Sequence, residues 1–227
     1  MKIATWNLER PTKHGHKTNG ISGYLKNLNA DILILTETNE CIDLGDEYKV
    51  FHTEKFVSKK YTRKPGDRQV SIFSKYPVIK QLPTFRADTS ICLSVDSPNG
   101  ELIVYGTIIG NFGNIGEQFK TDLESQLIDF QSITENNNIC IAGDLNMTFI
   151  DNFYFTKDGR EKLNNVFKQL NLKILTDKIS ENIDHIVISD KLLQNKNIYT
   201  GFWNDTTDEI ERLSDHKGVY VEILNVE

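Results

Sequence analysis

The chain has 227 residues, of which 38% are hydrophobic and 26% are charged, and its formal net charge is −6 at pH 7. This length and composition are typical of one globular domain with a sizeable core. No run approaches the roughly 18 apolar residues of a membrane span, the start "MKIATWNLER" turns polar too early for a secretory signal, and the negative charge argues against a protein that coats nucleic acid.

The cysteines, Cys41, Cys92 and Cys140, are odd in number and far apart in the sequence. This spacing disfavours both a disulfide framework and a zinc site, so a reducing cytoplasm is the expected location. Nothing in the sequence specifies a protein partner, and the polar composition makes a monomer the expected state.

Short apolar runs rich in β-branched residues recur along the whole chain and are bounded by polar or turn-forming residues. Such runs predict β-strands. The predicted strands cover residues 2–6, 31–36, 48–52, 69–74, 90–95, 101–109, 139–143, 183–189 and 218–224.

Apolar residues at helical spacing predict three helices, over residues 21–28, 119–133 and 163–170. The helices fall between strands rather than in a separate block. This order predicts a single α/β domain over residues 1–227, with helices packed outside a mixed sheet or a pair of sheets.

Polar side chains occur where the apolar runs end or begin. Each of them alone would be unremarkable, because such residues often cap turns. Together they form a set of oxygen ligands, amides and imidazoles: Asn7, Glu37, Asp144, Asn146, Asp184, His185, Asp215 and His216.

This set of residue types suits phosphoryl chemistry. Oxygen ligands without thiolates favour Mg²⁺, Mn²⁺ or Ca²⁺ over zinc. A phosphorus atom under attack needs a metal to neutralise charge, hydrogen-bond donors to its oxygens, and a base to orient water. The inventory contains a candidate for each of these tasks.

The motifs "TWNLE", "LTE", "GDLN", "IDHIVI" and "SDHKGV", in this order, resemble those of the endonuclease/exonuclease/phosphatase superfamily. The resemblance spans the chain from Asn7 to His216. It implies a four-layer α/β sandwich of two packed sheets flanked by helices, with the site where loops from both sheets meet. It also implies a metal-dependent phosphoesterase, like the pancreatic-type DNases, abasic-site endonucleases, sphingomyelinases and inositol-phosphate 5-phosphatases.

The same resemblance implies the metal ligands. Glu37 matches the principal ligand of Mg²⁺, for which Mn²⁺ could substitute. Asn7 matches a nearby metal or phosphate contact, and Asp215 could add a further metal contact.

Four catalytic roles are implied in the same way. Asp144 matches the carboxylate that orients or deprotonates the attacking water, and Asn146 matches the amide that holds a phosphate oxygen. His216 matches the catalytic histidine, and Asp184 its partner, which fixes the tautomer and raises the pKa of the imidazole. His185 alternates to the opposite face of its strand and is expected to pack.

The chain departs from the family pattern at two places. Ile108 stands where many relatives have a histidine or tyrosine, and Asn111 is a candidate to supply a phosphate contact instead. Lys217 and Gly218 replace the proline that usually follows "SDH". The Ile108 departure keeps open a binding protein with weakened catalysis.

The substrate is expected to be a nucleic acid, DNA or RNA. Basic residues gather in a loop that includes Arg10 and in a second loop at 55–68 that includes Arg68, and such loops around an acidic metal centre would attract a polyanion. Trp203 is a candidate to stack on a base. The alternative is a phosphatase or phosphodiesterase of small or lipid-linked phosphates.

Overall fold

The computed structural model describes residues 1–56, 64–110, 115–134, 137–204 and 212–226. Its helices are α1 (His16–Leu28), α2 (Glu117–Thr134), α3 (Lys157–Gln169) and α4 (Asp190–Leu193). Its strands are β1 (Lys2–Asn7), β2 (Ile32–Asn39), β3 (Lys49–His52), β4 (Asp67–Ser74), β5 (Val78–Leu82), β6 (Ser90–Ser97), β7 (Gly100–Ile108), β8 (Asn138–Asp144), β9 (Leu172–Ile174), β10 (Asp184–Ser189), β11 (Lys196–Trp203) and β12 (Gly218–Asn225).

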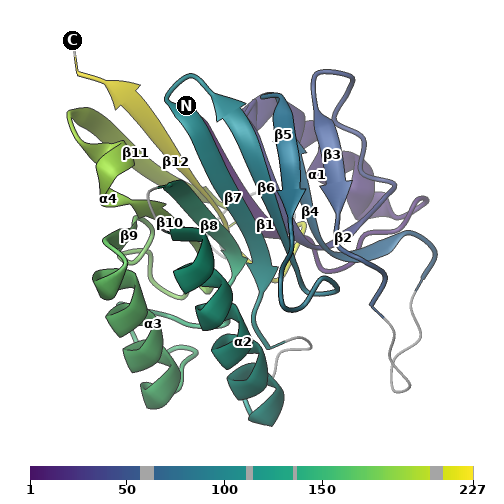
Figure 1. The fold of residues 1–227 in the computed structure, drawn as a ribbon. Helices are drawn as coiled ribbons and strands as arrows, with labels where there is room; N and C mark the ends of the chain where they lie inside the picture. The colour runs from purple at the N-terminus through teal and green to yellow at the C-terminus, as the bar shows by residue number, and fades with distance from the viewer. Residues whose placement is uncertain (57–63, 111–114, 135–136, 205–211, 227) are drawn as a thin grey trace.

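The strands form two six-stranded mixed sheets (Figure 1). One sheet has the order β11-β12-β1-β2-β4-β3, and the other has the order β5-β6-β7-β8-β10-β9. Each contains one parallel pair, β1 with β2 and β7 with β8. A helix connects the strands of each pair, α1 in the first sheet and α2 in the second, because parallel neighbours need a crossover connection.

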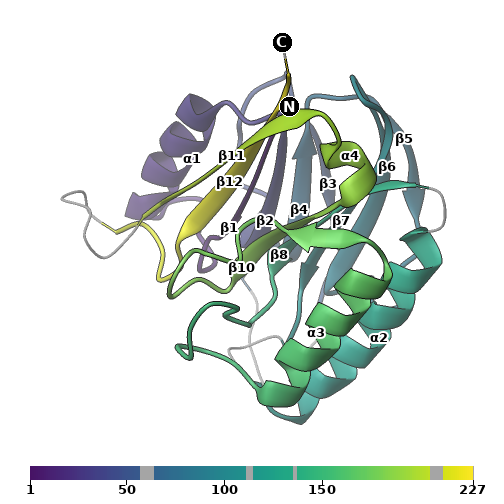
Figure 2. The same cartoon turned by 90° about the vertical axis from the view of Figure 1, so that its left-hand side faces the viewer.

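The sheets pack face to face, and helices cover their outer faces (Figure 2). The central layer of side chains comes from both sheets and includes Ile34, Ile72, Val104 and Ile186. Helix α1 covers the first sheet, while α2 and α3 cover the second. The structure therefore confirms the predicted four-layer α/β sandwich.

The sheets approach each other closely at Gly106 of β7. A Cβ atom added there would lie 3.0 to 3.2 Å from side chains of Val70, Ile34 and Ile72 on the opposite sheet. Those distances are shorter than ordinary van der Waals contact. The missing side chain thus permits the narrow spacing near the carboxyl end of β7.

All nine predicted strands and three predicted helices are present, whereas β5, β9, β11 and α4 were not predicted. Strands β5 and β11 lie at sheet edges and are half exposed, so their sequences, "VIKQL" and "KNIYTGFW", lack a continuous apolar run. Strand β9 has three residues. Trp203 is the last residue of β11. None of the described helices combines the length and apolar character needed to cross a membrane.

His185 packs on the outer face of β10, as expected from alternation. It is fully buried, and its Nε2 donates to the Met147 carbonyl (2.8 Å), so Nδ1 is left to accept from the Thr176 hydroxyl (2.9 Å). Burial is the largest influence on this ring and lowers the pKa of His185 to about 4.

This buried neutral histidine should make stability fall in acid. Between about pH 6.5 and 4 the unfolded chain takes up a proton that the folded protein excludes, so the free energy of unfolding should fall by about 3 kcal/mol from this group. His185→Gln should lack this contribution. The check is urea unfolding of both proteins from pH 7 to 4; parallel pH dependences would contradict the assignment.

Candidate active site

The polar residues predicted at strand ends meet at one edge of the sandwich. In the first sheet Asn7, at the end of β1, pairs in register with Thr36 of β2. In the second sheet Asp144, at the end of β8, pairs with Asp184, which begins the antiparallel strand β10. His216 precedes β12, which is antiparallel to β1. The strand directions therefore bring all these positions to the same edge.

Two hydrogen bonds cross between the sheets at this edge. Asn7 Nδ2 donates to Asp144 Oδ2 (3.1 Å), and both residues are buried. His216 Nδ1 donates to Asp184 Oδ2 at 2.6 Å, and the Asp184 side chain is 1% exposed. The carboxylates of the second sheet are thus held by an amide and an imidazole of the first.

The segment that carries His216 is fixed by contacts to β1. The Ser214 hydroxyl donates to the Asn7 carbonyl (2.6 Å) and accepts from the His216 backbone N–H (3.2 Å). The Trp6 indole N–H donates to the His216 carbonyl (3.1 Å). These bonds fix the backbone at His216, and the bond of Nδ1 to Asp184 then holds the imidazole ring.

The buried charges shift each other's protonation. Burial alone would lower the pKa of His216, but the carboxylates of Asp184, Asp144 and Asp215 outweigh it and raise the pKa to about 10. Burial is the largest influence on Asp144, and together with the Asp184 charge it raises the pKa of that carboxyl to about 7, against the opposing effect of His216. At neutral pH, His216 is therefore a cation and Asp144 is poised to exchange a proton.

Asn146 has a left-handed backbone (φ 49°), and its N–H donates to Asp144 Oδ1 (2.9 Å). Its side-chain nitrogen donates to the carbonyls of Ile109 (2.8 Å) and Gly110 (3.4 Å). Because a backbone carbonyl can only accept a hydrogen bond, the side-chain atom of Asn146 that faces these two carbonyls must be the nitrogen and not the oxygen. The nitrogen that was expected to hold a phosphate oxygen thus donates to two backbone carbonyls in this structure.

Glu37 also has a left-handed backbone (φ 44°), within β2. Its carboxylate pairs with Arg10, whose guanidinium donates to Glu37 Oε1 (2.6 Å) and to Gln69 Oε1 (3.0 Å). Gln69 is 1% exposed and was not predicted as a site residue. Its place at the start of the predicted strand 69–74 was the available signal, but only the fold shows that this side chain holds Arg10.

Two other predicted site residues, Arg68 and Trp203, lie in different surroundings. Arg68 pairs with Glu40 and donates to the Thr53 carbonyl (3.0 Å), and the described contacts do not join it to the Asp144 cluster. Trp203 is 6% exposed; its ring stacks on Tyr24 and meets Trp6 edge to face, so its indole is packed in the layer beneath α1 rather than presented for base stacking.

Asp215 has a side chain that is 65% exposed, and its carboxylate lies 3.8 Å from His216 Nε2. Asn111 falls outside the described residues. Ile108, opposite Asp144 in the β7–β8 register, is 1% exposed and packs in the core between the sheets. The side chain at this position therefore contributes packing, and the polar groups of the site come from other strands.

The donor set fits a hard divalent cation. One carboxylate oxygen each from Asp144 and Asp184 and a ring nitrogen of His216 lie within 4.8 Å of one another. The carboxylates are the candidate ligands, because a protonated imidazole has no free lone pair for a metal. Asp184 Oδ1 is buried and accepts no hydrogen bond from the described residues. A buried carboxylate oxygen without a donor is costly unless a cation or water satisfies it. No thiolate stands among these donors, which suits Mg²⁺ or Mn²⁺. Glu37, on the first sheet, has its carboxylate paired with Arg10 in this structure.

The sequence model of the Endonuclease/Exonuclease/phosphatase family matches residues 4–216. A search of curated proteins finds no match. Among solved structures, a 3′ phosphatase from Neisseria bound to a product DNA hairpin is 15% identical, with a TM-score of 0.72 over 98% of this chain and 99% of that chain.

Two further structures are similar. An AP endonuclease from Archaeoglobus fulgidus is 16% identical, with a TM-score of 0.68 over 98% of this chain and 99% of that chain. An endonuclease/exonuclease/phosphatase from Beutenbergia cavernae is 15% identical, with a TM-score of 0.70 over 99% of this chain and 71% of that chain. At these identities the likeness concerns the fold.

The pairing of His216 with Asp184 predicts an unusual titration. The His216 ring should stay protonated through neutral pH and lose its proton near pH 10. Asp184→Asn removes the paired charge while burial remains, so the pKa of His216 should fall by several units. NMR of the imidazole signals against pH checks both values. A wild-type His216 that titrates near 6.5 would contradict the geometry.

Proposed function

The chain belongs to the endonuclease/exonuclease/phosphatase family, whose members hydrolyse phosphoester bonds, and from that premise we propose that it is a nuclease. It would cleave phosphodiesters of DNA or RNA by attack of water on phosphorus, assisted by Mg²⁺ or Mn²⁺. The proposal rests on one observation: Asp144, a buried carboxylate with a raised pKa, lies at the same sheet edge as the buried His216–Asp184 pair.

Asp144 is the base in this proposal. Its two oxygens are held by Asn7 Nδ2 and the Asn146 N–H, so its orientation is fixed before substrate arrives. A pKa near 7 lets the carboxylate take a proton from water without being too weak a base. The carbonyl oxygen of Asn146, two residues on, can accept a hydrogen bond from the same water or contact a cation.

His216 is the electrostatic partner. Because the imidazole is a cation at neutral pH and its Nδ1 donates to Asp184, Nε2–H is the donor available to a phosphate oxygen. Its positive charge would stabilise the negative charge that builds up as water attacks. Asp184 holds the ring in place and preserves its charge.

Glu37, with Asn7 and Asp184 as further oxygen donors, would hold the divalent cation. When bound, the ion neutralises charge on the phosphate oxygens and polarises the phosphorus. In this structure the cation paired with Glu37 is Arg10, which places a guanidinium within reach of a phosphate at the same edge.

The surroundings favour a polyanionic substrate. A hollow of about 250 Å³ is lined by Arg10 and by further basic side chains, Lys17, Lys64 and His16, with one acid, Glu9, which pairs with Lys17 (3.6 Å). A basic rim around an acidic centre attracts a polymer of phosphates more than an isolated phosphate. The DNA hairpin bound to the Neisseria phosphatase and the AP endonuclease of Archaeoglobus fulgidus support the same class of substrate.

Removal of either catalytic group should strongly slow cleavage. Asp144→Asn deletes the base and His216→Ala deletes the cation, and each should lower kcat by at least ~100-fold. The assay uses end-labelled single- and double-stranded DNA, RNA, an abasic duplex and small phosphate esters, with Mg²⁺ or Mn²⁺ and an EDTA control.

Asp96→Asn is the matched control, since Asp96 is an exposed carboxylate of β6 near the opposite end of the second sheet. It should retain full activity. Turnover of small esters alone would replace the nuclease proposal with a phosphatase. If the folded wild-type protein turns over none of these substrates, the nuclease proposal is wrong and a binding function without catalysis replaces it.

Glu37→Gln should weaken metal use. The substitution keeps the shape of the side chain but removes its charge, so the Mg²⁺ concentration for half-maximal cleavage should rise ~10-fold or more. Glu40→Gln, three residues away and paired with Arg68, is the control and should leave that concentration unchanged. Equal Mg²⁺ dependences for Glu37→Gln and wild type would exclude Glu37 as a ligand.

A further inference from the structure

Helix α2 buries polar side chains on the face that packs against the second sheet. Asp122 and Gln126 are 0% exposed and Asp129 is 9% exposed. A helix that only covers a sheet would place apolar residues there, because a buried carboxylate is costly unless it is paired. These residues therefore need partners, which come from β7 and the turn after it and from the segment between β5 and β6.

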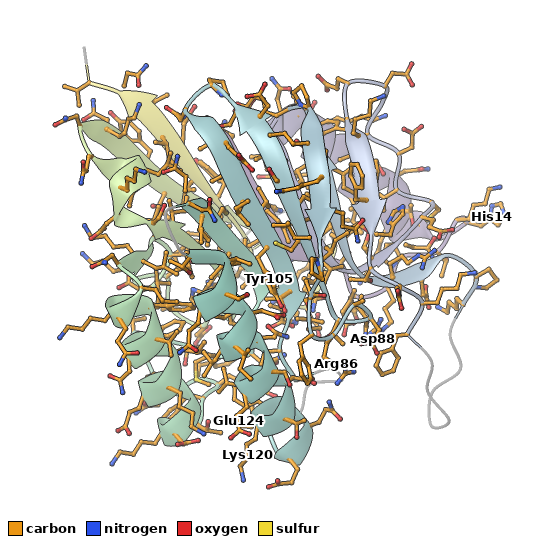
Figure 3. All side chains as sticks on the ribbon, viewed as in Figure 1. His14, Arg86, Asp88, Tyr105, Lys120 and Glu124 are labelled. Carbon is orange, nitrogen blue, oxygen red and sulfur yellow. The ribbon has the colours of Figure 1, made fainter. Side chains whose placement is uncertain are left out.

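Asp122 is the centre of this network. Its Oδ1 accepts from Arg86 (2.8 Å) and from Gln118 Nε2 (2.8 Å), and its Oδ2 accepts from the Gly110 N–H (3.3 Å). Arg86 comes from the segment between β5 and β6, and Asp88 holds its guanidinium through two hydrogen bonds of 2.9 and 3.1 Å. In Figure 3, Arg86 and Asp88 lie side by side next to the first half of α2.

The network reaches the candidate site through the turn at Gly110. Gly110 has a positive φ of 73°, a conformation that glycine adopts without strain. Its N–H donates to Asp122, while its carbonyl and that of Ile109 accept from Asn146 Nδ2. Gln126 Nε2 also donates to the Ile108 carbonyl (3.2 Å). The backbone that holds the Asn146 amide is thus fixed from α2.

The charge of Arg86 keeps this arrangement in place. Burial is the largest influence on Asp122 and raises the pKa of its carboxyl, whereas the Arg86 guanidinium opposes that rise. Without the guanidinium, the buried carboxylate would tend to take up a proton. A protonated Asp122 would be a weaker acceptor for the Gly110 N–H.

We propose that Arg86 and Asp122 are positioning residues that hold Asn146, through the Gly110 turn, with its carbonyl oxygen toward the reacting water or metal. The effect on catalysis rests on the proposed function, whereas the holding of Asn146 by Arg86 and Asp122 can be tested without any activity. Neither residue need touch the substrate. Arg86 lies outside the family motifs of the sequence and would act through two intervening residues.

The first test needs no activity. The side-chain NH₂ of Asn146 and the Gly110 N–H should exchange slowly with solvent in the wild-type protein, as followed by ¹⁵N NMR. Arg86→Ala should speed their exchange at least ~10-fold and shift the Asn146 side-chain signals, with Arg86→Lys in between. Lys120→Ala is the control, because Lys120 lies on the solvent side of the same helix (Figure 3) and pairs with exposed Glu117.

The second test is kinetic. If Asn146 acts in the transition state, its misplacement in Arg86→Ala should lower kcat ~10- to 100-fold while KM changes less than about 2-fold. Arg86→Lys should recover part of the loss, and Asp122→Asn should lower kcat in the same way. Each variant is checked for folding by circular dichroism, and Arg86→Lys serves if Arg86→Ala does not fold.

Folded Arg86 variants with wild-type exchange at Asn146 and Gly110 would overturn the inference. Altered exchange with unchanged kcat would overturn its catalytic part. If the wild-type protein cleaves no phosphodiester, the proposed function fails, while the exchange experiment still decides whether Arg86 and Asp122 hold the Asn146 amide.

Discussion

The candidate site depends on the hydrogen bond between His216 and Asp184, because this contact joins the two sheets at the edge where the chemistry is proposed. Asp184 belongs to β10 of one sheet, and His216 precedes β12 of the other. The Asn7–Asp144 bond crosses the same gap. Both bonds require a fixed distance between the sheets, and that distance is set by the apolar layer between them and by the close approach at Gly106. The packing of the core thereby determines the geometry of the site.

Backbone conformation is the second constraint. Glu37, within β2, and Asn146, two residues after the end of β8, both have positive φ angles. A non-glycine residue in this region costs on the order of 1 kcal/mol or more, and such residues gather at functional sites where the surrounding structure holds them. Glu37 is held by its bond to Arg10, which in turn bonds to Gln69. Asn146 is held by its bonds to the carbonyls of Ile109 and Gly110. The strain is thus offset by bonds that also orient the side chains.

Sequence patterns predicted a layered α/β domain and the strand-end residues, because buried strands carry continuous apolar runs and polar residues mark where they stop. The two packed sheets of the sandwich were implied by the family resemblance. The edge strands β5 and β11 were not predicted, because half-exposed strands mix apolar and polar residues. The orientation of the Asn146 amide could not be predicted, because it depends on carbonyls 36 and 37 residues away. Asp122 and Arg86 gave no signal either: a charged residue on an amphipathic helix is usually solvated, and only the fold shows that Asp122 is buried beneath the β7 turn. Trp203, a candidate to stack on a base, packs against Trp6 and Tyr24.

The central claim, water attack on a nucleic-acid phosphorus, is tested most directly by cleavage in ¹⁸O-labelled water. The wild-type protein is incubated with Mg²⁺ and short single- and double-stranded oligonucleotides of DNA and of RNA, and the terminal phosphate of each product is analysed by mass spectrometry. The predicted result is one ¹⁸O atom in the phosphate for each bond cleaved, with no incorporation in EDTA. Absence of cleavage of every oligonucleotide by the folded protein, or cleavage that leaves the product phosphate free of ¹⁸O, would contradict the claim.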